Sequence, residues 1–257
     1  MHPVLFELGP LTVYSYGLFV VLACVVAVAV TLLLANRAGL PAARLADYAL
    51  YGTLAALVGA RVWYLALRPD EIGGFASWFA IGGGRLALPG GLLLGSVVLV
   101  LLLRRHREPV WRWLDVITVG AVAGLAIGKL GSYLNGDYLG TATGLPWGLA
   151  YDERPALATI GERLHPLAIY AAVIYAAIAL YAYRLWRLRP RPAPAGMVFW
   201  TGMLLVAVVQ LILEPWHHPA DTLYLTGGLR AVVPVSLVLC TVSLWVLVTR
   251  YRERQRP

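Results

Sequence analysis

The sequence predicts an all-α, polytopic integral membrane protein of about seven transmembrane helices. Of its 257 residues, 60% are hydrophobic and only 13% are charged, about half the charged share of a typical soluble domain. The apolar residues gather in seven runs, each close to the roughly 20 residues that a helix needs to cross a bilayer. Because no intervening stretch could form a separate soluble core, residues 1–257 are predicted to form one membrane domain with a short basic tail, 249–257.

The seven runs define the expected helices in chain order. The third run contains Pro89, Gly90 and Gly91, which predicts a broken or re-entrant helix, a form tolerated only where it is buried in protein or lines a wet cavity. The fourth run ends in a glycine-rich polar stretch, so its end is poorly defined. The runs are Tyr16–Leu34, Leu45–Leu67, Leu86–Leu103, Val116–Leu134, Leu167–Leu185, Met197–Leu213 and Val232–Val248.

Basic residues alternate in number between successive loops, and this predicts the orientation. The loops after the first, third and fifth runs and the C-terminal tail together hold 14 arginines, whereas the alternate loops hold 5. Cytoplasmic loops carry the excess of Lys and Arg. We therefore expect the N-terminus outside and the C-terminus in the cytoplasm. The net charge of +8 is explained by this topology, so nucleic-acid binding is not predicted.

Several polar residues lie within or beside the apolar runs. Arg61 interrupts the second run, and Lys129, the only lysine, lies in the fourth. An ionisable group near the bilayer centre costs at least about 2.5 kcal/mol. Arg offers a planar fork that matches phosphate, and Lys offers a point charge. A site for an anionic lipid head group is one explanation; the other is that Arg61 snorkels, or pairs with Asp47 or Asp137, to hold helices together.

The segment Glu214–Asp221 contains two adjacent histidines and two carboxylates. Adjacent histidines seldom share one metal ion, and no metal or cofactor is predicted for the chain. Neither a Gly-x-Ser-x-Gly elbow, nor a phosphate-binding glycine loop, nor a metalloprotease motif occurs in it.

Taken together, the motifs resemble those of the bacterial prolipoprotein diacylglyceryl transferase family, in the same order over most of the chain. The most specific is Gly128-Lys129-Leu130-Gly131-Ser132-Tyr133-Leu134-Asn135-Gly136-Asp137-Tyr138-Leu139-Gly140, similar to the signature Gly-Arg-x-Gly-Asn-Phe-x-Asn-x-Glu-x-x-Gly. The other matching pieces are Gly9-Pro10 with Tyr16-Gly17, Asp47 with Gly59-Ala60-Arg61-Val62-Trp63-Tyr64, Gly90-Gly91, Pro146-Trp147, His165-Pro166 with Tyr170, and Glu214-Pro215.

The resemblance implies an activity and its partners. That family transfers a diacylglyceryl group from phosphatidylglycerol to the thiol of the lipobox cysteine in a prolipoprotein signal peptide, the first step of lipoprotein maturation. It implies a multi-pass protein of the bacterial plasma (inner) membrane, surrounded by membrane lipids, acting as a monomer without a cofactor.

The resemblance also implies roles for particular residues. Lys129, Asp137 and His165 are the expected catalytic residues, with Asp137 positioning Lys129 and His165 serving as a possible base. For His165 the alternative is that it only begins a helix at the membrane interface. The expected substrate-binding residues are Arg61, Gly90, Gly91, Ser132, Asn135, Tyr170 and Glu214.

The chain departs from the family pattern at several polar positions. The histidine of the His-x-Gly-Gly loop is replaced by Leu88 or Pro89, and the signature arginine, asparagine and glutamate are Lys129, Ser132 and Asp137. Three further polar family residues are replaced by apolar ones, namely Ala168, Ala171 and Leu213. A lysine cannot make the bidentate contact of an arginine.

Two other functions stay open at this stage. The replaced residues are compatible with a relative that binds phospholipid or lipoprotein signal segments without transfer. Broken spans and buried charges are also typical of small-solute transporters, although no internal half-repeat is visible.

Overall fold

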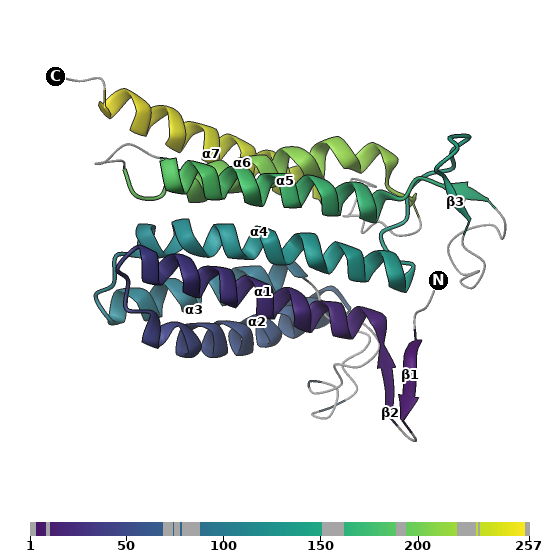
Figure 1. Ribbon diagram of the computed structural model, residues 1–257, viewed down its shortest axis with the longest axis horizontal. Coiled ribbons are helices and arrows are strands. Elements are labelled where there is room, and N and C mark those ends of the chain that lie inside the picture. Colours follow the sequence, from purple (N-terminus) through teal and green to yellow (C-terminus); the bar gives the residue numbers. More distant parts are fainter. Residues whose placement is uncertain are drawn as a thin grey trace. The chain divides into compact units, whose positions relative to one another are not determined.

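The computed structural model describes residues 4–8, 11–68, 74, 78, 88–150, 162–188, 194–219, 230 and 232–254 (Figure 1). Four residues named above lie outside these ranges: Gly9, Pro10, Leu86 and Asp221. So do five of the loop and tail arginines counted above: Arg85, Arg154, Arg189, Arg191 and Arg256.

The described chain is dominated by seven long helices, which confirms the all-α, polytopic membrane fold. Six helical segments are long and apolar enough to cross a membrane, the exception being α3. The number of spans and the orientation of the termini remain predictions. The helices are α1 (Ser15–Arg37), α2 (Leu45–Leu67), α3 (Leu88–Arg105), α4 (Val110–Asn135), α5 (Leu167–Leu188), α6 (Met197–Leu213) and α7 (Val232–Arg254).

The expected break in the third run is wrong for the described residues 88–105. Pro89 lies in the first turn of α3, where a missing backbone N–H costs no intrahelical hydrogen bond and the fixed φ of proline suits the helix. The helix therefore begins at this motif and continues through both glycines to Arg105.

Two small antiparallel pairs of strands were not predicted. Strand β1 (Val4–Leu8) pairs with β2 (Leu11–Tyr14), which leads directly into α1. Strand β3 (Leu149–Ala150) pairs with β4 (Arg163–Leu164), just before α5. Elements of two to five residues carry too few side chains for a period-2 pattern to be visible.

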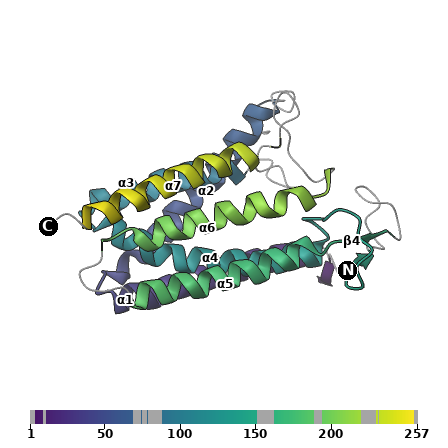
Figure 2. The same ribbon diagram turned by 90° about the horizontal axis from the view of Figure 1, so that it is seen from above.

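The chain divides into two compact units, residues 1–34 with 114–257 and residues 35–113. In the first unit, helix α4 packs along α1 and α5, and α6 lies beside α5 and α7 (Figure 2). The α1–α4 contact is close because Gly120 and Gly124 face Ala27; small residues allow such approach between membrane helices. The core of the unit lies where α4, α5 and α6 meet, at Val122, Ala126, Leu167, Ala171, Tyr175, Ile178, Ala179, Val209 and Leu213.

Helix α6 is capped by a carboxylate from another helix. Its own N-cap, Gly196, has no side chain and a φ of +91°. The fully buried Asp115 of α4 accepts hydrogen bonds from the backbone N–H of Gly196 (2.9 Å) and of Phe199 (3.0 Å). These N–H groups are otherwise unsatisfied at a helix start, so Asp115 both caps α6 and joins it to α4.

In the second unit, α2 and α3 pack backbone to backbone. A Cβ added at Gly90 would meet the carbonyl oxygen of Gly59 and the Cβ of Trp63, and one added at Gly91 would lie 2.9 Å from the carbonyl oxygen of Ala56. Both glycines are buried. Gly90 and Gly91 thus allow α3 to approach α2 at the turn that carries Arg61.

We expect Gly90→Ala to lower the free energy of unfolding by about 1–3 kcal/mol, because overpacking forces the backbones apart. Thermal unfolding in detergent would measure the change. Gly52→Ala in α2 is the matched control: a Cβ there meets nothing within 4 Å, and alanine favours a helix. Equal stability of the two variants would contradict the close-packing role of Gly90.

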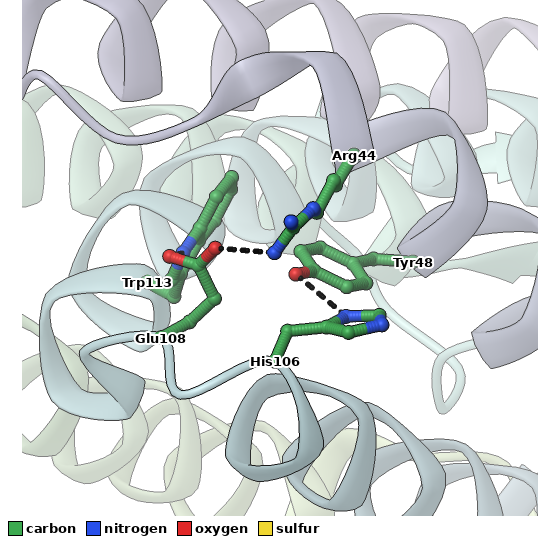
Figure 3. Close-up of polar contacts among 5 residues, drawn as sticks. All are labelled: Arg44, Tyr48, His106, Glu108 and Trp113. Atoms are coloured by element: carbon green, nitrogen blue, oxygen red, sulfur yellow. Dashed lines mark hydrogen bonds and ion pairs between the residues drawn. The ribbon is translucent and has the colours of Figure 1, made fainter.

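A polar cluster lies at the other end of this unit, where α2 begins and α3 connects to α4 (Figure 3). The guanidinium of Arg44 lies 3.2 Å from Glu108, whose other oxygen accepts a hydrogen bond from the Trp113 indole at 3.3 Å. The hydroxyl of Tyr48 is 3.1 Å from Nδ1 of His106. This cluster joins the short loops of the basic side, which is predicted to be cytoplasmic.

Candidate functional site

The signature segment forms the end of α4 and the turn that follows it. Gly136, with a φ of +76°, ends the helix. Its N–H bonds to the carbonyl of Tyr133 (3.2 Å), and the N–H of Asp137 bonds to that of Ser132 (2.9 Å). This is the Schellman arrangement, which needs a left-handed residue. It explains the glycine and places Asp137 just beyond the helix.

Lys129 lies one to two turns before this helix end, and its ammonium faces an aromatic ring. The Nζ atom is 2.9 Å from the centroid of the Tyr138 ring. The neighbouring polar residues also meet, since Asn135 Nδ2 donates a hydrogen bond to Asp137 Oδ2. The structure therefore brings Lys129, Asn135 and Asp137 to one helix terminus. That Asp137 positions Lys129 remains a prediction.

The segment after the signature lies between the start of α5 and the end of α6. The N–H of Thr141 bonds to the carbonyl of Trp216 (2.7 Å), and the N–H of His165 bonds to the carbonyl of Thr141 (3.0 Å). Gly140 packs against His165, where a Cβ would meet the carbonyl and Cβ of that histidine. Backbone pairing thus fixes His165 and the α6 terminus beside the end of α4.

His165 and Tyr170 form a second polar group at the start of α5. Nδ1 of His165 lies 3.4 Å from the hydroxyl of Tyr170, and that hydroxyl accepts a hydrogen bond from the Trp147 indole at 2.7 Å. The tyrosine hydroxyl donates to Nδ1 in one tautomer of His165 and accepts from it in the other. The group therefore contains an imidazole with a hydrogen-bonded hydroxyl, the arrangement that a proton transfer needs.

Glu214 is buried just after α6 and is paired with an arginine that the sequence analysis treated only as a loop charge. Arg230 Nη1 lies 3.5 Å from the carboxylate of Glu214 and 2.5 Å from its backbone carbonyl oxygen. Sixteen residues separate the two, so no local spacing indicated the pair. It brings a guanidinium to the residue beside Leu213, the position where the family pattern has an arginine.

Arg61 belongs to the second unit, together with Gly90 and Gly91. Its side chain is only 4% exposed and lies over the ring of Tyr64 at 5.4 Å. Such burial does not match snorkelling to the surface. Asp47 precedes it by fourteen residues of the same helix, a rise of about 21 Å, which is beyond the reach of the side chain. The pairing with Asp47 is therefore wrong.

The apolar replacements serve packing in the first unit. Ala168, Ala171 and Leu213 are all buried, and the last two belong to the apolar core between α4, α5 and α6. In the histidine pair of the 214–221 segment, His217 packs edge-on against Tyr138. Within the described part of the chain, no three His, Cys, Asp or Glu side chains come together in a way that could hold a metal ion.

Four further candidates in the first unit were not predicted as site residues. Tyr138 and His217 were noted only within longer segments, Arg230 only as a loop charge, and Gln210 not at all. A fifth, Tyr16, lies in the first turn of α1, near Asp137. It was noted only as part of a motif.

Comparisons with known proteins give one consistent family. A family model described as prolipoprotein diacylglyceryl transferase matches residues 3–249. Three relatives carry the name phosphatidylglycerol–prolipoprotein diacylglyceryl transferase. The protein of Synechococcus elongatus is 31% identical over 97% of this chain and 87% of its own length. The protein of Parasynechococcus marenigrum is 30% identical over 99% and 96%, and that of Chromohalobacter salexigens is 29% identical over 95% and 92%.

Proposed function

Because the chain belongs to the prolipoprotein diacylglyceryl transferase family, we propose that it transfers the diacylglyceryl group of phosphatidylglycerol to the cysteine thiol of prolipoproteins. The observation that carries this proposal is the match of the family model to residues 3–249, nearly the whole chain. The signature at the end of α4 and the polar groups of α2, α5 and α6 all fall within it.

The transfer replaces one bond by another at a glycerol carbon. The cysteine sulfur forms a C–S bond to that carbon, while the bond between the same carbon and the phosphate oxygen breaks. Glycerol phosphate leaves with the electron pair, and the thiol proton passes to a base. Negative charge develops on the departing phosphate, and stabilising such charge is the largest contribution in many enzymes.

In the first unit, Lys129 supplies a compact ammonium with three N–H donors to meet this charge. In the second unit, Arg61 is the cation that the family resemblance assigns to the lipid head group, and its guanidinium is a planar fork. Asn135 and Ser132 orient the head group by hydrogen bonds. Gly90 and Gly91 take part through the close α2–α3 packing, which sets the position of the helix turn that bears Arg61.

The proton of the thiol needs an acceptor. His165 is the proposed base, held by the Tyr170 hydroxyl at 3.4 Å and by the backbone of Thr141. Asp137 is the alternative acceptor, since it precedes Tyr138 in the turn at the end of α4 and is hydrogen-bonded to Asn135. Glu214 follows the C-terminal end of α6 directly, and its ion pair with Arg230 stabilises the chain there.

Phosphatidylglycerol and the signal peptide both reside in the bilayer. The protein is a multi-pass membrane protein, and we place it in the bacterial plasma (inner) membrane as a monomer. Substrates would then enter from the lipid phase, with the phosphate at the outer leaflet.

A reconstituted transfer assay tests the proposal. Purified protein in vesicles containing phosphatidylglycerol is mixed with a lipobox peptide that has a free cysteine, and the peptide mass is measured. The expected result is a gain of one diacylglycerol, with release of glycerol phosphate. A matched peptide with serine in place of cysteine should gain nothing.

A negative result has a defined meaning. If vesicles that support a full-motif relative give no transfer here, while phosphatidylglycerol still binds, the chain is the non-catalytic lipid-binding relative. Absence of both transfer and binding would contradict the head-group site itself.

We expect His165→Gln to lower the transfer rate about 10²–10⁴-fold, the usual contribution of a positioned general base. The pH dependence of the rate separates this role from a structural one. If His165 is the base, the pH–rate profile of His165→Gln should differ in shape from that of the wild type, whereas a purely structural role should lower the rate equally at every pH. Retention of the wild-type pH profile in His165→Gln would leave His165 as an interfacial helix start.

A further inference from the structure

Tyr138 lies at the centre of the signature turn and contacts three residues from different parts of the first unit. The ammonium of Lys129 lies over its ring, with Nζ 2.9 Å from the ring centroid. Its hydroxyl donates a hydrogen bond to Gln210 Oε1 of α6 at 3.2 Å. Its ring also meets that of His217 at 4.5 Å and 89°. The contacts with Gln210 and His217 thus hold the side chain in place, while one face of the ring contacts the lysine.

The backbone of Tyr138 adopts an unfavourable conformation to place the ring there. Its φ is +61°, a left-handed region that bulky side chains rarely occupy. Within the described chain only Arg107 shares this property among non-glycine residues. Residues held in such conformations by their surroundings concentrate at functional sites. The signature leaves this position unspecified, so the family pattern does not account for the tyrosine.

An aromatic face has a particular advantage for a cation that must bind phosphate. The negative face of the ring attracts an ammonium ion, yet the ring carries no net charge. Unlike a carboxylate, it leaves the positive charge of Lys129 undiminished for an anion. A compact ammonium can sit directly over the ring centre while its remaining N–H donors point elsewhere.

We propose that Tyr138 is a positioning residue for the reaction: its ring fixes the Lys129 ammonium so that it meets the phosphate of the lipid substrate. The inference rests on the proposed function. It concerns this chain in particular, because Lys129 stands where the family signature has an arginine. The ring, rather than the hydroxyl, performs the role, and the contacts to Gln210 and His217 keep the ring in place.

The test compares Tyr138→Phe with Tyr138→Leu. Phenylalanine keeps the ring and loses the bond to Gln210, whereas leucine keeps apolar bulk and loses the aromatic face. We expect Tyr138→Phe to stay within about threefold of wild-type kcat/KM, and Tyr138→Leu to lose about tenfold, the order of a partly desolvated cation–π contact. Affinity for a short-chain phosphatidylglycerol, measured by calorimetry in detergent, should fall in parallel.

The same binding measurement in a Lys129→Met background completes a double-mutant cycle. If the ring acts through the lysine, Tyr138→Leu should cause no further loss of affinity there. Tyr138→Asn, which tolerates a left-handed backbone, should unfold no earlier than Tyr138→Leu and show the same loss, which separates the effect from misfolding.

The outcomes distinguish this inference from the proposed function. Suppose the wild type transfers diacylglycerol and Tyr138→Leu has the same kcat/KM: the positioning role is then overturned, while the transferase function stands. The same conclusion holds if the losses of affinity in Tyr138→Leu and Lys129→Met simply add. A loss in Tyr138→Phe as large as in Tyr138→Leu also overturns it, since the hydroxyl would then be the active part. A wild type that neither transfers nor binds phosphatidylglycerol overturns both.

Discussion

Replacing Lys129 by alanine is expected to reduce diacylglyceryl transfer by at least about 10²-fold, the usual consequence of removing one group that stabilises transition-state charge. Lys129 is the only lysine of the chain, and it lies in α4, where an uncompensated charge is costly. Its ammonium is held over the Tyr138 ring, and Asn135 and Asp137 are hydrogen-bonded to each other at the end of the same helix. Rates of peptide mass gain in vesicles would measure the effect.

Two further variants isolate the charge of Lys129. Lys129→Met keeps the length of the side chain and should be as inactive as the alanine variant. Lys129→Arg keeps the charge and should retain partial activity, because a planar guanidinium fork places its charge and its N–H donors differently from a compact ammonium. The exposed Arg105, at the end of α3, provides the control: Arg105→Ala should leave the rate unchanged. Wild-type activity in Lys129→Met would remove Lys129 from the site.

The largest expected effect on stability belongs to Asp115. Its carboxylate accepts hydrogen bonds from Gly196 and Phe199 at 2.9 and 3.0 Å and is fully buried. Hydrogen bonds to a charged group contribute about 1.5–3 kcal/mol each, and a buried donor left unpaired costs about 1–3 kcal/mol. We therefore expect Asp115→Ala to lower the free energy of unfolding by about 3–5 kcal/mol.

Thermal unfolding in detergent and resistance to proteolysis would measure the loss for Asp115→Ala. The matched control is Asp47→Ala, which removes an exposed carboxylate from the first turn of α2 and should cost under about 1 kcal/mol. Asp115→Asn should fall between them, because an amide has one acceptor oxygen in place of two. If Asp115→Ala and Asp47→Ala were equally stable, the capping of α6 from α4 would not matter to the fold.

Comparing these two predictions also distinguishes an effect on the chemistry from an effect on the stability of the fold. Lys129 variants should unfold near the wild-type temperature yet lose transfer, whereas Asp115 variants should lose activity only in proportion to the protein that is unfolded. Measuring both quantities on both residues makes each the control for the other.

The sequence by itself determined the helical class, the approximate position of each helix and the identity of the two costly cations. Bilayer thickness imposes a length on every apolar run, so α2 and α6 begin and end where hydropathy predicted. Arg61 and Lys129 stand out for the same reason, since a charge inside an apolar run is expensive wherever the chain folds. The ordered motifs, the signature at the end of α4 above all, determined the family.

Only the tertiary structure decided which side chains meet. Tyr138 joins Lys129, Gln210 and His217, and Arg230 joins Glu214, across separations that no local period encodes. The continuous α3 and the capping of α6 by Asp115 likewise depend on a turn position and on a neighbouring helix. Hydrophobic length is a local property of each segment. The partners of buried polar groups are instead determined by packing, because a buried polar group is stabilised by a hydrogen-bond partner that only the folded chain brings to it.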